Sequence, residues 1–138
     1  MRHNPADAAP HNPEEMTIRR AGTAIARAPE GIASGPFWVE RLLDGSRDGE
    51  MTAMRATLDP GVRTHWHGHP LGQLLYVLSG VGLAQRDGGP VAEARAGDCV
   101  WFAPGERHWH GASPDSAFAY VSIQAVRDGT AVHWLEPV

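Results

Sequence analysis

Five of the eight histidines in this chain fall in two short runs. The first run, residues 65–73, contains His67 and His69, and the second contains His108 and His110. Imidazole is the commonest protein ligand for transition metals, and residues two apart on a strand point to the same side of a sheet. The runs therefore predict a divalent metal site that His67 and His69 form together and that His108 joins from a distant strand.

Gln73 is the candidate oxygen ligand of this site. A carboxamide oxygen can coordinate a metal but brings no negative charge, so the ion would keep its full dipositive charge. Such a site favours Lewis-acid chemistry over a change of oxidation state, and an open coordination position would admit a substrate. The alternative is that Gln73 only donates hydrogen bonds inside the fold and that the three histidines hold the ion alone.

His110 is the candidate general base. It lies two residues beyond His108 and shares its face if the strand is regular. An ordinary imidazole pKa of about 6.5 suits proton transfer near neutral pH. The alternative is a structural histidine bonded to the backbone. His65 lies two residues before His67 and would face the same side of a regular strand. It is either a hydrogen-bond donor to the metal ligands or a partly exposed residue at the rim of the site.

The elements that must position these residues are strands. After the first sixteen residues, short apolar runs alternate with turn signals such as Asp-Gly pairs, and no segment has a helical pattern of adequate length. We predict a mobile tail over residues 1–16 and a single all-β domain over residues 17–138, built as a sandwich or closed barrel. The expected strands are 37–43, 51–58, 73–79, 82–86, 98–102, 117–124 and 132–135.

Composition limits the partners and the compartment. Lys and Arg number 12 against 16 Asp and Glu, a net charge of -4 without a basic run, so neither nucleic acid nor an anionic membrane is an expected partner. We expect a small-molecule ligand. No apolar stretch approaches a membrane span, and the N-terminus lacks the apolar centre of a secretory signal, so we expect a cytoplasmic protein. Cys99, the single cysteine, is expected to be a small buried residue.

The spacing of the two runs resembles the two motifs of the cupin superfamily, whose members are small conserved β-barrels. The first motif is Gly, five residues, His-x-His, three or four residues, Glu, six residues and Gly, and residues 61–80 keep this spacing with Gln73 at the glutamate position. The second motif is Gly, five residues, Pro-x-Gly, two residues and His, and Gly97 and His108 keep its ends while the proline is displaced to Pro104. The Asn that often follows is Ala112 here. The resemblance covers about residues 37–137 and implies a metal-binding barrel.

More narrowly, residues 67–73, 101–111 and 123–124 resemble the bacterial cupin hydroxynitrile lyases. This resemblance implies a metal, most often manganese, with iron, nickel or zinc as alternatives. The implied ligands are His67, His69, Gln73 and His108. It also implies that His110 takes the hydroxyl proton of a 2-hydroxynitrile. The remaining expected roles are a cavity position for Gln124, where it would bond the nitrile or hydroxyl of the substrate, and control of pocket volume by Met54 and Ala56.

Two other functions stay open at this point. Many cupins activate dioxygen at a metal, so a metal-dependent oxidoreductase or dioxygenase is the second hypothesis. A non-catalytic cupin that binds metal or a small ligand is the third. The resemblance further implies a homodimer, with residues 17–39 as candidates for strand exchange between subunits.

Overall fold

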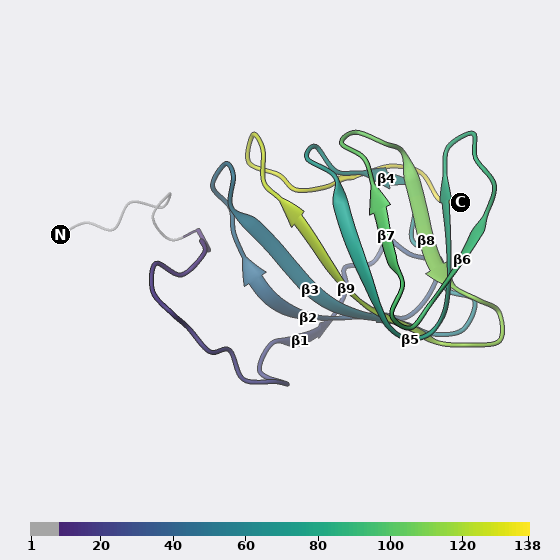
Figure 1. The fold of residues 1–138 in the computed structure, drawn as a ribbon, viewed down its shortest axis with the longest axis horizontal. Coiled ribbons are helices and arrows are strands. Elements are labelled where there is room, and N and C mark those ends of the chain that lie inside the picture. Colours follow the sequence, from purple (N-terminus) through teal and green to yellow (C-terminus); the bar gives the residue numbers. More distant parts are fainter. Residues whose placement is uncertain (1–8) are drawn as a thin grey trace.

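A computed structural model describes residues 9–138, and within this range the chain forms strands and turns without a helix (Figure 1). The all-β prediction is therefore confirmed. The strands are β1 (Ile25–Arg27), β2 (Phe37–Asp44), β3 (Met51–Leu58), β4 (His67–Gly68), β5 (Gln73–Arg86), β6 (Ala92–Arg95), β7 (Cys99–Phe102), β8 (His108–Ala112), β9 (Phe118–Ala125) and β10 (His133–Trp134).

The strands pair into a strongly curled sheet with the order β1-β2-β3-β9-β5-β8-β4-β10, and β6 and β7 both pair with β5. Figure 1 shows β2, β3 and β9 side by side, with β8 and β4 beyond β5. All pairs between these strands are antiparallel. The curl places β4 and β8, which carry histidines, opposite the concave face of β2 and β3.

β5 is the strand that joins the two parts of the sheet. Its first half pairs with β7 and β9, and its second half pairs with β6 and β8. Gly80 lies between the halves at φ +78°, and a Cβ there would lie 1.8 Å from the carbonyl oxygen of Ala117. A residue without Cβ is therefore required where β5 crosses the start of β9.

The predicted strands at 73–79 and 82–86 are one continuous strand, because the glycines between them bend β5 without ending it. β1, β4, β6 and β8 were not predicted. β8 is buried at all five positions, so it lacks the alternation of buried and exposed residues by which a half-buried strand is recognised.

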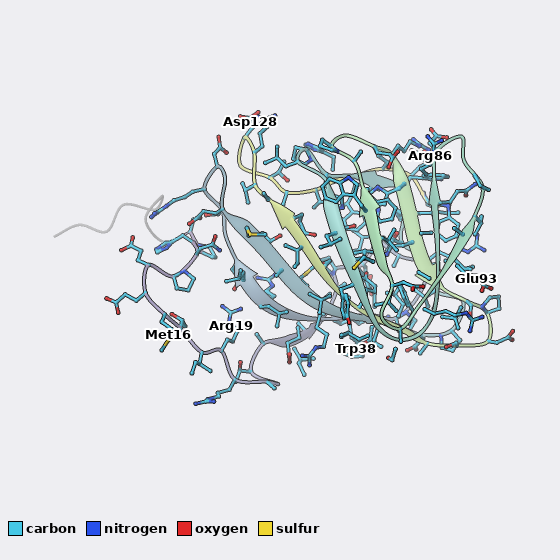
Figure 2. The ribbon with its side chains drawn as sticks, in the orientation of Figure 1. Met16, Arg19, Trp38, Arg86, Glu93 and Asp128 are labelled. Atoms are coloured by element: carbon cyan, nitrogen blue, oxygen red, sulfur yellow. The ribbon has the colours of Figure 1, made fainter. Side chains whose placement is uncertain are left out.

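The core lies between the two curled halves of the sheet. On β9 the even-numbered residues from 118 to 124 are buried and the odd-numbered ones are half-buried, as expected of a strand with one face inside. Leu58, Leu75 and Phe118 are almost fully buried in this core. Figure 2 shows Trp38 of β2 on the outside of the sheet, where 45% of its surface is exposed.

Cys99 is exposed, so the expectation of a buried cysteine is wrong. On β7 the inward positions are Val100 and Phe102, while Cys99 and Trp101 point outward. The four residues of β7 are all apolar or weakly polar, so their sequence did not indicate which alternate positions face the core. No helix among residues 9–138 has the length and apolarity that a membrane crossing requires.

Residues 1–8 of the predicted tail lie outside the described residues. The remainder of the predicted tail contains no strand, and Asn12 of this part bonds the turn before β3. The backbone nitrogen of Asn12 donates to the Glu50 carboxylate at 3.1 Å. The side-chain amide of Asn12 donates to the Met51 carbonyl oxygen at 2.8 Å and accepts from the Met51 backbone nitrogen at 2.9 Å. The mobility of the tail stays a prediction.

Candidate metal centre

Four histidine side chains meet on the concave side of the sheet. His67 begins β4, His69 follows in the next turn, and His108 and His110 lie on β8. All four are at most 3% exposed. β4 and β8 are adjacent, with His67 paired to His108 in register, and this pairing brings the two sequence runs together.

The rings of His67, His69 and His108 lie close together. Their centroids are 5.2 Å apart for His67 and His69, 4.3 Å for His67 and His108, and 5.4 Å for His69 and His108. The structure differs from the sequence argument in one respect: β4 ends at Gly68, so His69 reaches the cluster from a turn and not from the alternation of a strand.

Each of these three imidazoles is fixed by a hydrogen bond from Nδ1 to a main-chain carbonyl. The distances are 2.8 Å from His67 to His65, 2.7 Å from His69 to Ala131 and 2.9 Å from His108 to Glu106. Such a bond places the proton on Nδ1 and leaves Nε2 as a lone-pair donor, which is the arrangement typical of metal-ligating histidines. The Nε2 atoms of His69 and His108 are buried without a partner among the described residues.

Gln73, the first residue of β5, supplies an oxygen to the same space. Its Nε2 donates to Oε1 of Gln124 at 2.9 Å, and the Nε2 of Gln124 in turn donates to the carbonyl and hydroxyl oxygens of Thr52. A carbonyl oxygen only accepts, so Thr52 fixes the orientation of the Gln124 amide and, through it, that of the Gln73 amide. Gln73 Oε1 is left buried without a hydrogen bond within residues 9–138.

His110 differs from the other three histidines. Its backbone nitrogen donates a hydrogen bond to the Thr64 hydroxyl oxygen, but neither ring nitrogen has a partner in the described part of the chain. Its ring lies 5.2 Å from that of His67 and packs edge-on against Tyr120 at 5.1 Å. The imidazole is not bonded to backbone, as a structural histidine would be, so its nitrogens remain free to meet a ligand.

Burial keeps these imidazoles neutral. Loss of solvation lowers the pKa of His67 and His110 well below the ordinary value, and it lowers the pKa of His108 to about 4. The neighbouring histidines lower the pKa of His67 and His110 further, because two adjacent imidazolium ions would repel each other. A neutral imidazole carries the lone pair that a metal ligand or a base needs.

The buried donor atoms fit a divalent ion. Unpartnered buried nitrogen and oxygen atoms are costly unless something binds them, and here several converge. Among residues 9–138, ligand atoms of His67, His108 and His110 lie within 4.8 Å of one another, so these three histidines are close enough to share an ion. The set that the sequence predicted has His69 in place of His110. His69 has a main-chain bond of the kind that orients a ligating ring, and the His110 ring has none.

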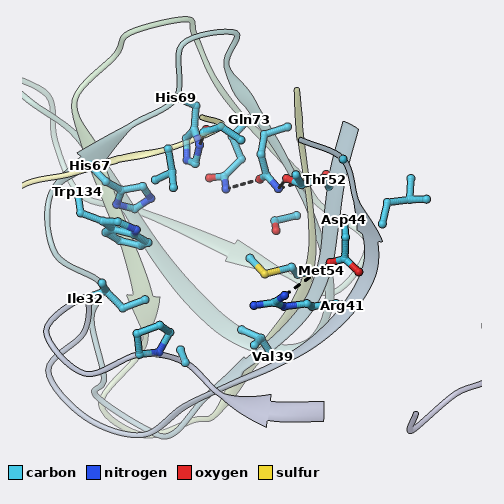
Figure 3. Close-up of a pocket in the computed structure, with 18 of the residues that line it drawn as sticks. Ile32, Val39, Arg41, Asp44, Thr52, Met54, His67, His69, Gln73 and Trp134 are labelled. Atoms are coloured by element: carbon cyan, nitrogen blue, oxygen red, sulfur yellow. Dashed lines mark hydrogen bonds and ion pairs between the residues drawn. The ribbon is translucent and has the colours of Figure 1, made fainter. Parts of the chain in front are cut away.

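A pocket of about 550 Å³ opens beside the histidines (Figure 3). His67, His69 and Gln73 lie along one side of it, and Val39 and Met54 lie along the other, from β2 and β3. Met54 lines the pocket as expected. Ala56 is fully buried in the core, and the pocket is not lined by it.

Tyr120, Ser122 and Trp134 are among the residues of the pocket wall that were missing from the sequence argument. Trp134 of β10 stacks against His67 with the ring centroids 4.5 Å apart, and Tyr120 and Ser122 of β9 face the cavity. Tyr120 and Ser122 share the parity of Gln124, so the alternation along β9 would have identified them. Nothing in the local sequence connects Trp134 to His67, because they meet only through the pairing of β10 with β4.

His65 acts through its main chain, since its carbonyl oxygen holds His67, and its side chain is half-buried. Gln124 lines the pocket as expected. The structure thus brings together every residue that the sequence singled out for the metal site and its base.

The fold and the site are those of a cupin: residues 54–124 match the family model described as a cupin domain, and the chain belongs to this family. The chain is 44% identical to the (R)-mandelonitrile lyase of Granulicella tundricola over 124 residues, which cover 89% of this chain and 95% of that protein. Among solved structures, a cupin-like protein of Thermotoga maritima shares 32% identity with a TM-score of 0.74, over 82% of this chain and 86% of the other.

A polyketide cyclase of Streptomyces resistomycificus has a TM-score of 0.70 at 20% identity, over 89% of this chain and 88% of that one, and this likeness concerns the fold alone. The chain is therefore a cupin with a lyase among its relatives and a histidine cluster able to hold a metal ion.

Proposed function

We propose that this cupin is a metal-dependent lyase that cleaves 2-hydroxynitriles to an aldehyde and cyanide, and forms them in reverse. One observation carries the proposal: imidazoles anchored through Nδ1 converge with the free oxygen of Gln73 beside His110, whose ring has no hydrogen bond within residues 9–138. The identity to a relative named (R)-mandelonitrile lyase supports it.

In this proposal His67, His69, His108 and Gln73 hold the ion. When bound, a divalent ion supplies Lewis acidity that lowers the pKa of a substrate hydroxyl. Manganese is the proposed metal, with iron, nickel and zinc as alternatives, because imidazole and amide ligands accept all of them.

His110 accepts the hydroxyl proton on a ring nitrogen. The electron pair of the O–H bond becomes part of the new C=O bond, and the bond between the carbinol carbon and the nitrile carbon breaks with its pair on cyanide. The proton then passes from His110 to cyanide, which leaves as hydrogen cyanide. Burial lowers the pKa of His110 and so keeps its ring in the neutral form, which is the form that can accept a proton.

Gln124 has a narrower role than the sequence suggested. Its amide nitrogen already donates to the carbonyl and hydroxyl oxygens of Thr52, so we do not expect it to donate to a nitrile. Its Oε1 accepts from Gln73 and retains a second lone pair. We therefore propose that Gln124 acts by orienting Gln73, since the single hydroxyl proton of the substrate is directed at His110 and cannot also be donated to Gln124 Oε1.

The test is cyanide release from racemic mandelonitrile by manganese-loaded protein. Chelated protein and a His110→Ala variant serve as negative samples, and His11→Ala, at an exposed residue outside the pocket, is the matched control. We expect activity in wild type and His11→Ala only, with the metal content of His110→Ala unchanged. Metal loss in His110→Ala with full binding by His69→Ala would instead select the grouping of His67, His108 and His110.

The rival functions are outcomes of the same experiment. A metal-loaded protein that releases no cyanide but consumes oxygen with a phenolic substrate would be an oxidoreductase. Tight ligand binding without turnover, unchanged in His110→Ala, would identify a binding protein.

We further propose that residues 17–138 act as one domain in a cytoplasmic homodimer. Light scattering on the purified chain gives the mass directly, and a monomer at micromolar concentration would contradict the dimer.

A further inference from the structure

The pocket has a charged end away from the histidines, and a β-bulge creates it. Arg41 of β2 pairs with Met54, whereas the next paired residue, Leu43, is opposite Ala53, so Leu42 is an extra residue. After this bulge, Asp44 is paired with Thr52. Bulges re-aim the side chains that follow them, and they are frequent beside functional sites.

The bulge puts Arg41 and Asp44 on the same face. Met54 and Thr52, their partners on β3, both line the pocket, and so do Arg41 and Asp44 themselves. In a regular strand, residues three apart would point to opposite faces and one of the two charges would face outward. Figure 3 shows Arg41 directed into the cavity beside Met54, across from His69 and Gln73.

The charge of Arg41 is only partly balanced. Its Nη1 lies 4.0 Å from Asp44 Oδ1, beyond hydrogen-bonding distance, and its guanidinium donates no hydrogen bond within residues 9–138. Asp44 is already bonded through Oδ2 to Arg19 Nη2 at 3.1 Å, and Arg19 Nη1 bonds the main-chain carbonyl of Arg41 at 2.9 Å. Two guanidinium groups therefore share one carboxylate, so the three groups together carry a net charge of +1, and Arg41, which lines the pocket, keeps free N–H donors.

We propose that this end of the pocket is a carboxylate subsite and that the protein prefers substrates carrying an anionic carboxylate at the end opposite the reacting hydroxyl. Arg41 binds that carboxylate through its free N–H groups, in the two-pronged geometry that guanidinium offers. The inference rests on the proposed function for the identity of the reacting group, and the substrate class becomes a 2-hydroxynitrile, or its aldehyde, with a remote carboxylate.

The apolar wall between the two ends fits such a molecule. The pocket wall near Arg41 is formed by the apolar side chains of Val39, Leu43 and Met54. Trp134 lines the side of the pocket next to His67. A substrate with a hydroxyl at the histidines and a carboxylate at Arg41 would place its hydrocarbon part against this wall. The Arg41 side chain is 63% exposed, so an anion reaches it without displacing packed residues, and solvent moderates the attraction.

Binding, and not turnover, is the first test. We would measure the affinity of the manganese-loaded protein for 4-(hydroxymethyl)benzoate and for its neutral counterpart 4-(hydroxymethyl)benzamide by calorimetry, in wild type, Arg41→Met and Arg95→Met. Arg95 is the matched control because it is an exposed arginine that does not line the pocket. A charge-assisted hydrogen bond is worth roughly a factor of ten in affinity at the low end of its range.

We expect the benzoate to bind about tenfold more tightly than the benzamide in wild type and Arg95→Met, and equally in Arg41→Met. Equal affinities in wild type would overturn the subsite. A preference that survives in Arg41→Met would also overturn it, because the carboxylate would then be held by the metal or the histidines.

The same variants separate this inference from the proposed lyase activity. A protein that releases no cyanide from any hydroxynitrile, yet loses its benzoate preference with Arg41, would retain the subsite and lose the lyase assignment. Cyanide release from mandelonitrile, with no Arg41-dependent preference between 4-carboxymandelonitrile and mandelonitrile in kcat/KM, would retain the lyase and refute the subsite.

Discussion

Replacing Gln124 by Met tests whether Gln73, the proposed oxygen ligand, is oriented by the chain of amide hydrogen bonds that begins at Thr52. Methionine is similar in length, but its thioether cannot donate to Thr52 and is only a weak acceptor for Gln73 Nε2. The Gln73 amide would lose the one hydrogen-bond partner, among residues 9–138, that distinguishes its nitrogen from its oxygen, and it would turn its NH₂ group toward the ion for part of the time.

The magnitude follows from the bonds removed. Loss of groups that orient a ligand typically reduces metal affinity between 10- and 100-fold, and we expect about tenfold because the three imidazoles keep their own anchors. The metal-free protein loses three neutral hydrogen bonds of Gln124, one to Gln73 and two to Thr52, at about 1 kcal/mol each, so its free energy of unfolding should fall by about 3 kcal/mol.

Manganese titration by calorimetry and urea denaturation of the metal-free protein measure the two effects separately. Thr52→Val is the matched control, since it removes the hydroxyl but keeps the carbonyl that fixes the Gln124 amide, and its metal affinity should change less than threefold, or about 0.6 kcal/mol. The reasoning is refuted if Gln124→Met binds manganese as tightly as wild type while Gln73→Ala binds it more weakly. Unchanged affinity in both variants would show that Gln73 is not a ligand.

Three further results are expected from denaturation experiments. Gly80→Ala should reduce the free energy of unfolding by at least about 3 kcal/mol, because a Cβ would collide with the Ala117 carbonyl. Gly88→Ala, at a similar positive φ but in open space, should reduce it by about 1 kcal/mol. Equal losses in the two variants would contradict the expected collision. Trp109→Ala should reduce the free energy of unfolding by about 3 to 5 kcal/mol, since the ring is fully buried. Trp101→Ala, at a residue that is 59% exposed, should reduce it by about 1 kcal/mol or less. A larger loss at Trp101 than at Trp109 would contradict this expectation. Manganese at about 100 times its dissociation constant should stabilise the fold by about 2.7 kcal/mol, reversibly with chelator, and a melting temperature unaffected by metal would count against a built-in site.

The strands and the site differ in how far the sequence could predict them. Strands such as β3 and β9 were predictable because one face is buried and the other is not, which produces alternation along the chain. β8 was not, because its five positions are all buried and its residues are polar and aromatic as often as apolar. The candidate metal-site residues could nevertheless be singled out, since their spacing resembles the cupin motifs independently of any strand assignment.

Local sequence alone determined that this protein is all-β, which histidines belong together and that a glutamine stands where the family usually has a glutamate. These features depend on residue type and on spacing within short segments. The tertiary structure decided the rest, because it depends on contacts between distant strands. The pairing of β4 with β8 unites the two runs, the chain from Thr52 through Gln124 sets which atom Gln73 presents, and the bulge in β2 turns Arg41 and Asp44 to the same side of the pocket.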